Sequence, residues 1–146
     1  MKKLLLLIAL VLGINAMAYA GDTYSRDEKV LPKAALVTIA NNFKAKVSLI
    51  KIEKTLGITT EYEVILSDGS EISFDREGNW LNVEVAESKS VPSGFILSGI
   101  NDYVNKNHPK TRIVGIERDG NNFDIDLSDG LEMEFTGTGT FIKYED

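Results

Sequence analysis

Carboxylates are the side chains of this 146-residue chain that could support chemistry, because it has 22 Asp and Glu residues, one His and no Cys. Without Cys, a catalytic thiol, a disulfide, a thiolate zinc site and an iron–sulfur cluster are all excluded. The single His108 excludes an ordinary multi-His metal site, and because Pro109 follows it we expect an exposed helix end there. Two options remain: an acid–base pair of carboxylates, and a carboxylate-bearing binding surface.

Two short strings resemble functional motifs but lack their context. Ser48 and Lys51 fit the S-x-x-K string of penicillin-recognising enzymes, yet the segment alternates as a strand does, which places the two side chains on opposite faces. Residues 124–130 resemble a calcium loop, but Asp129 occupies the position where an EF-hand needs Gly. We therefore expect no catalytic Ser–Lys pair, no EF-hand, and no resident metal or cofactor.

The first 20 residues have the order of a secretory signal peptide. A basic start is followed by the apolar run Leu4–Leu12 and by the A-x-A sequence that ends at Ala20, with Ala18 as the second choice of cleavage site. The run is shorter than the roughly 20 residues that span a membrane. A bacterial lipoprotein needs a Cys at its processing site, so we expect a periplasmic or secreted protein with no membrane insertion after cleavage.

The net charge of the mature chain indicates which classes of partner are disfavoured. Cleavage removes two of the 16 basic residues and none of the 22 acidic ones, so the formal net charge falls from −6 to −8. Nucleic acids and anionic lipids are themselves polyanions and are disfavoured. A protein or peptide with a basic surface is favoured.

The mature sequence is a tandem duplication. The hairpin sequence of residues 62–69 is answered by residues 123–130 at an offset of 61, and Ile52-Glu53-Lys54 by Ile116-Glu117-Arg118 at an offset of 64. We assign residues 21–30 to an N-terminal segment, 31–85 to repeat 1, 86–90 to a linker and 91–146 to repeat 2, with 31–146 as one structural unit. Internal repeats of this kind indicate duplicated supersecondary units.

Each repeat predicts one helix followed by an antiparallel meander of about four strands. Pro32 and Pro92 suit the first position of a helix, and one-sided apolar stripes follow each. In the hairpins, a three-residue loop with a left-handed Gly pairs Val64 with Ile72 and keeps the apolar faces aligned. The same register in repeat 2 pairs Ile125 with Met133. The fold class is therefore α+β, with both helices on one face of a single sheet of about eight strands.

The other sheet face is polar and contains the candidate binding residues. Ile65 is an apolar anchor on that face, and Trp80 is either a second anchor or part of the core. The acidic face is either a recognition surface or only a solubilising one. The predicted binding residues are Glu61, Glu63, Ile65, Glu71, Ser73, Trp80, Asp124, Asp126, Glu132 and Glu134.

The repeated order of apolar-Pro, helix, Tyr/Phe-acid-x-x-Leu-Ser-Asp-Gly and Glu-apolar-x-Phe resembles the PepSY-like family of small secreted bacterial proteins. The resemblance covers the mature chain in two copies and implies a fold like that of β-lactamase-inhibitor proteins. It also implies a binding or inhibitory role, and it supplies no catalytic residues.

The leading hypothesis is a non-enzymatic periplasmic or secreted binding module, for example an inhibitor of an envelope enzyme, that uses the acidic face. The alternatives are a carboxylate-dependent hydrolase, which requires a concave pocket holding two acids, and a weak carrier of divalent cations or small ligands. The sequence does not define the oligomeric state.

Overall fold

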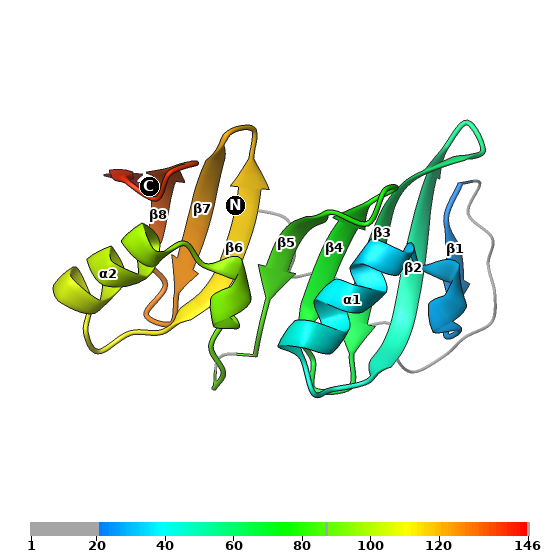
Figure 1. Ribbon diagram of the computed structural model, residues 1–146, viewed down its shortest axis with the longest axis horizontal. Coiled ribbons are helices and arrows are strands. Elements are labelled where there is room, and N and C mark those ends of the chain that lie inside the picture. Colours follow the sequence, from blue (N-terminus) through cyan, green and yellow to red (C-terminus); the bar gives the residue numbers. More distant parts are fainter. Residues whose placement is uncertain (1–20, 87, 146) are drawn as a thin grey trace.

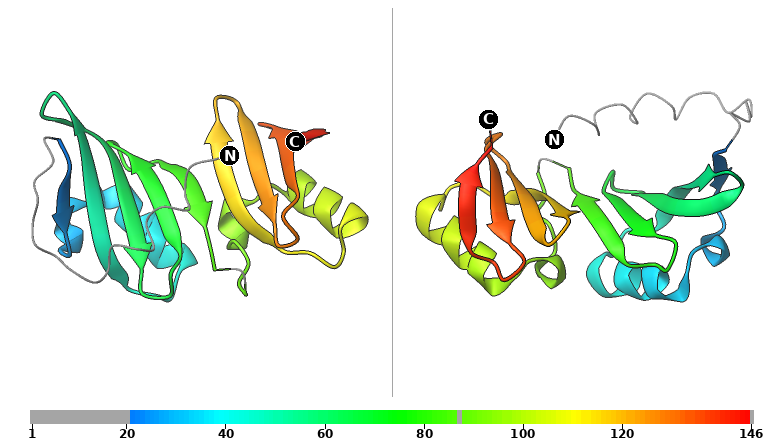
Figure 2. Two further views of the ribbon diagram at one scale, coloured as in Figure 1. Left: turned by 180° about the vertical axis from the view of Figure 1, so that it is seen from behind. Right: turned by 90° about the horizontal axis from the view of Figure 1, so that it is seen from above.

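A computed structural model describes residues 21–86 and 88–145, which form one nine-stranded antiparallel sheet and two α-helices (Figure 1). The strands lie across the sheet in sequence order, from β1 at one edge to β9 at the other. Both helices cover the same side of the sheet, as the views from behind and above confirm (Figure 2). The predicted α+β class is therefore confirmed, whereas the predicted signal peptide lies outside the described residues.

Repeat 1 has four strands of its own and a short additional strand at its free edge. Its elements are β1 (Thr23–Ser25), a 3₁₀ helix (Glu28–Val30), α1 (Lys33–Asn42), β2 (Val47–Thr55), β3 (Ile58–Leu66), β4 (Glu71–Asp75) and β5 (Trp80–Glu84). Strand β1 was not predicted, since three residues are too few to show alternation. It comes from the N-terminal segment and pairs with β2.

Repeat 2 follows the same order without the edge strand. Its elements are a 3₁₀ helix (Ser93–Phe95), α2 (Ser98–Asn107), β6 (Ile113–Asp119), β7 (Asn122–Leu127), β8 (Glu132–Thr136) and β9 (Phe141–Tyr144). Three β5–β6 residue pairs join the repeats into one sheet. Within the described residues, no helix is both long and apolar enough to cross a membrane.

The helix starts differ from the prediction. Pro32 is the residue just before α1 rather than its first residue, and Pro92 precedes the short 3₁₀ helix instead of α2. Phe95 therefore lies outside α2, which begins only at Ser98. The predicted end of α2 is confirmed. His108 is the C-cap residue, and its backbone N–H donates to the carbonyl oxygen of Val104. Pro109 follows, and the residue before a proline avoids the helical conformation.

The hairpin registers agree with the prediction in both repeats. Val64 faces Ile72 and Ile125 faces Met133, so the apolar rows continue from strand to strand. In the first loop, Gly69 has a φ of 86°, which a residue with a side chain rarely adopts. The same conformation recurs in the loop of repeat 2.

The core lies between the sheet and the helices. Its largest fully buried apolar side chains are Ile50, Val64, Leu66, Ile72, Phe74, Val83, Ile100, Ile116, Ile125, Met133 and Phe135. The sequence did not determine which side chains of β2 point towards the core. In the structure these are Ile50 and Ile52. At the junction of the repeats, Phe95 lies against both Phe43 (5.8 Å between ring centroids) and Trp80 (5.3 Å).

Candidate functional site

The outer face, meaning the sheet side opposite α1 and α2, presents two rows of side chains across the strands. The first row consists of Lys51, Glu63, Ser73, Asn82, Glu117, Asp124, Glu134 and Lys143. The second consists of Leu49, Ile65, Glu71, Glu84, Gly115, Asp126 and Glu132. Residues directly opposite on neighbouring antiparallel strands have Cβ atoms about 5 Å apart, so most of the carboxylates in these rows lie close to another one.

The two ends of the first row carry its only lysines. Lys51 bonds to Glu53 at 2.5 Å and lies 3.5 Å from Glu63. Partial burial disfavours the charge of Lys51, but the hydrogen bond to Glu53 and the nearby carboxylates outweigh it and raise its pKa. At the other end, Lys143 lies 3.6 Å from Glu134.

The centre of the face has no such compensation. Within residues 21–86 and 88–145, no ion pair is formed by Glu84, Glu117, Asp124 or Asp126. Burial, together with the charges of neighbouring carboxylates, raises the pKa of Glu84 to about 7. Burial and like charges also raise the pKa values of Asp124 and Asp126 to about 6. These side chains therefore change charge close to neutral pH, where an isolated carboxyl group is fully ionised.

Gly115 allows one of these carboxyl groups to lie over the sheet. A Cβ atom at Gly115 would be 2.6 Å from Oδ2 of Asp126, so the Asp126 carboxyl group occupies the space above the backbone of β6. Its Oδ1 is buried and has no hydrogen-bond partner among the described residues. Because β6 lies between β5 and β7, this position brings Asp126 towards Glu84 across the repeat junction.

Nine of the ten predicted binding residues lie on the outer face, and Trp80 does not. Its partner across the strands is Phe74, which is buried beneath α1. The guanidinium carbon of Arg118 lies 4.0 Å from the Trp80 ring centroid. The reading of Trp80 as an outer anchor is therefore wrong, because an irregularity between β4 and β5 shifts the register by one residue and turns the side chain inward.

Sequence reasoning missed Glu84 and Glu117 as members of the face. Val83 is fully buried, so alternation along β5 would have placed Glu84 outward. For Glu117, the predicted repeat alignment was wrong by two residues. Ile52 pairs with Tyr62 and Arg118 pairs with Phe123, so the true offset of this strand is 66 and Lys51 of repeat 1 corresponds to Glu117 of repeat 2.

The other motifs do not form a reactive site. Ser48 and Lys51 lie on a strand, as expected. The ring Nε2 of His108 lies 3.1 Å from the Tyr144 hydroxyl at the exposed end of α2. Among the described residues, no three His, Cys, Asp or Glu side chains are grouped so that they could hold a metal ion. Of the two described cavities, one has Asp68 as its only carboxylate and the other has none.

Comparison with known proteins gives a family but no activity. A family model described as "Putative beta-lactamase-inhibitor-like, PepSY-like" matches residues 60–143. A search of curated proteins gives no match.

Three solved structures are similar over 86% of the chain. A protein of Bacteroides vulgatus described as a "putative periplasmic protein of unknown function" is 42% identical, with a TM-score of 0.80 over 100% of its length. A "putative calcium-regulated periplasmic protein" of Bacteroides thetaiotaomicron is 31% identical, with a TM-score of 0.77 over 97% of its length. A second Bacteroides vulgatus protein, described as a "putative periplasmic protein", is 28% identical, with a TM-score of 0.75 over 97% of its length. On the family model and these identities, the chain belongs to the PepSY-like, β-lactamase-inhibitor-like family.

Proposed function

We propose that this protein is a non-enzymatic binding module of the periplasm or the secreted fraction, and that the centre of its outer face binds a cationic protein or peptide. The uncompensated carboxylates of β5, β6 and β7 are the observation that carries this proposal. An inhibitor that covers a basic surface of an envelope enzyme is one form of such a module. The similar Bacteroides proteins described as periplasmic support the compartment.

The charge pattern across the junction favours a binding role over a solubilising one. In repeat 2, Lys143 faces Glu134, but the corresponding position of repeat 1 is Asn82, which faces Ser73. In repeat 1, Lys51 forms an ion pair with Glu63, but the corresponding residue of repeat 2 is Glu117. The basic residues are thus present at the two free ends and absent at the junction, which concentrates negative charge at the centre. General solubility requires no such placement.

A basic partner would relieve the repulsion among these groups. Carboxyl groups with raised pKa values would release protons as a Lys or Arg side chain approached, so binding should be linked to pH as well as to salt. Long-range attraction to the acidic face would also speed association. Ile65, beside Leu49 on the outer face, offers an apolar contact at one side of the acidic centre.

The test is affinity capture from an envelope extract of the source bacterium with residues 21–146 as bait, followed by titration of each retained protein. A charge-removed bait carries Glu84→Gln, Glu117→Gln and Asp126→Asn. A matched control bait loses the same charge elsewhere through Glu28→Gln, Glu77→Gln and Asp102→Asn.

We expect a basic partner whose affinity falls with salt and is lost only in the first variant. Equal retention by the two variant baits, or retention that does not respond to salt, would argue against the proposal.

A weak divalent-cation site is a second candidate. The buried, unpartnered Oδ1 of Asp126 beside Glu84 favours it, as does the description of one similar protein as calcium-regulated. The absence of a three-ligand group among the described residues implies low affinity. Calcium at millimolar concentration should then raise the melting temperature with the logarithm of its concentration, and Asp126→Asn should abolish the rise. A melting temperature that calcium leaves unchanged would exclude this candidate.

A further inference from the structure

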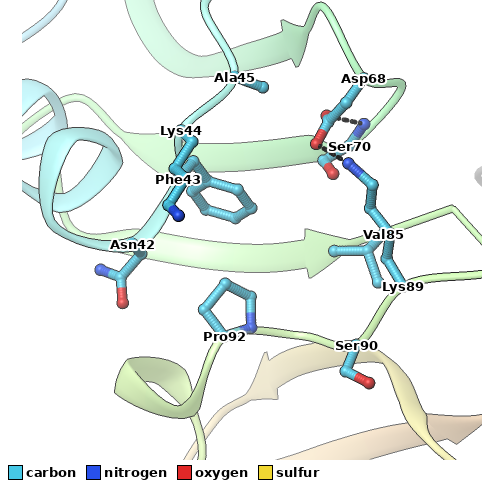
Figure 3. Close-up of a pocket in the computed structure, with 10 residues that line it drawn as sticks. All are labelled: Asn42, Phe43, Lys44, Ala45, Asp68, Ser70, Val85, Lys89, Ser90 and Pro92. Carbon is cyan, nitrogen blue, oxygen red and sulfur yellow. Dashed lines mark hydrogen bonds and ion pairs between the residues drawn. The ribbon is translucent and has the colours of Figure 1, made fainter.

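A hollow of about 360 Å³ lies where the two repeats meet, apart from the acidic outer face (Figure 3). Its walls come from the end of α1, the β3–β4 loop and the segment that leads into repeat 2. The hollow lies at the lower end of the range of small-molecule sites, about 300–1,000 Å³. Its lining is mixed, with apolar side chains of Phe43, Val85 and Pro92 among polar ones.

Ser70 lines this hollow, and its hydroxyl group is buried. Its side chain is 1% exposed, and its Oγ has no partner with hydrogen-bond geometry among the described residues. The nearby Asp68 carboxylate interacts with Ser70 and is already engaged by the Ser70 N–H and by the Lys89 ammonium. A buried hydroxyl group without a well-formed hydrogen bond destabilises the folded protein, so it requires an explanation.

The other repeat shows that the fold does not require this hydroxyl group. Leu131 occupies the position equivalent to Ser70, directly after the same Ser-Asp-Gly loop, and it is 39% exposed. Stability alone favours the reverse arrangement, with the apolar residue buried at the junction and the polar residue at the surface. A ligand that fills the hollow would satisfy the Ser70 hydroxyl group.

The charge of the hollow indicates an anion. The ammonium group of Lys89 is paired with Asp68, whereas Lys44 has no ion pair within the described residues. Lys44 and Asn42 lie on one side of the hollow, and Asp68, Ser70 and Lys89 lie on the other (Figure 3). The net charge of these groups is positive in a chain that is otherwise acidic.

We propose that this hollow binds a small apolar carboxylate, with its hydrocarbon part against Phe43, Val85 and Pro92 and its carboxylate between Lys44 and the Ser70 hydroxyl group. This site is independent of the acidic outer face. Either a free organic acid or the C-terminal residue of a peptide could supply this chemistry.

The test is titration of ¹⁵N-labelled residues 21–146 with 3-phenylpropanoate and with the tripeptide Gly-Gly-Phe, followed by NMR chemical shifts. Their uncharged amides serve as controls. We expect saturable shifts centred on Ser70, Val85 and Ser90, and at least tenfold weaker binding of each amide. Saturation by only one of the two acids would identify the source of the carboxylate.

Three variants test the assignment. Lys44→Met should weaken binding at least tenfold, whereas Lys46→Met, which removes a nearby lysine outside the hollow, should leave it unchanged. Ser70→Ala should weaken binding while raising the melting temperature of the free protein, because the unsatisfied hydroxyl group is removed.

The proposal is overturned by any of three results. These are no saturable shift with either acid at 20 mM, equal effects of the two lysine variants, and shifts that map to another part of the chain.

Discussion

Replacement of Glu84 by Gln should stabilise the protein at alkaline pH and leave its stability almost unchanged at acidic pH. Glu84 lies half-buried at the junction, where burial and the charges of Glu71, Asp126 and Glu117 raise its pKa from 4.5 to about 7. In the unfolded chain the group ionises at its ordinary pKa. Between these two values the folded state retains a proton that the unfolded state has lost, so the folded state loses stability as pH rises through this window.

The pKa shift sets the size of the effect. A rise from 4.5 to about 7 corresponds to about 3 kcal/mol at 1.4 kcal/mol for each pKa unit, and solvent screening of a half-exposed group reduces this to about 1–2 kcal/mol. Glu84→Gln should therefore raise the free energy of unfolding by about 1–2 kcal/mol at pH 8 and by nearly nothing at pH 4. Urea denaturation of residues 21–146 at pH 4, 6 and 8 measures the difference.

Glu77→Gln, in the exposed β4–β5 turn, is the control and should show no such dependence on pH. An equal gain for Glu84→Gln at pH 4 and pH 8 would mean that the charge of Glu84 is not the cause. A loss of stability at pH 8 would mean that the ionised form is favourable in the folded protein. Either outcome would refute the electrostatic account of the junction.

Three further substitutions test the fold. Phe95→Ala removes the ring that packs on Trp80 at the repeat junction and should cost about 3–5 kcal/mol in urea denaturation. Gly99→Ala would place a Cβ atom 2.7 Å from the carbonyl oxygen of Gly139 and should lower stability by about 1–3 kcal/mol. Leu56→Asn, at the β2–β3 turn where φ is +52° and the Leu side chain is 97% exposed, should raise stability by up to about 1 kcal/mol, measured in the same way.

Local patterns in the sequence were sufficient for the β3–β4 and β7–β8 hairpins. Alternation of apolar residues around the Ser-Asp-Gly loops determines which strand positions pair, because any other register would place charged side chains in the core. The pairing of Tyr62 with Phe74 follows from this argument and is present in the structure. The same reasoning placed nine of the ten candidate residues on the outer face.

Features that depend on irregular pairing or on contacts between the repeats could not be predicted. The sequence left both an outer and a core position open for Trp80, because the single-residue irregularity that turns it inward is not evident from its local sequence. The pairing of β5 with β6 brings Glu84 and Glu117 into one cluster, and no pattern within either repeat indicates that contact. The hollow at Ser70 likewise exists only because repeat 2 packs beside the β3–β4 loop.

The two repeats differ in both aromatic and charged residues where they meet. In repeat 2, Tyr103 stacks directly on Phe141 with ring centroids 4.4 Å apart. The corresponding rings of repeat 1, Phe43 and Trp80, each contact Phe95 of repeat 2 instead. On the outer face, the lysine positions retained at the free ends are replaced by Asn82 and Glu117 at the junction. The aromatic change strengthens the contact between repeats, but the charge change weakens it through repulsion. Since stability accounts for the first change and opposes the second, the acidic centre is not explained by the stability of the fold, and this is the reason for the cationic partner that we propose.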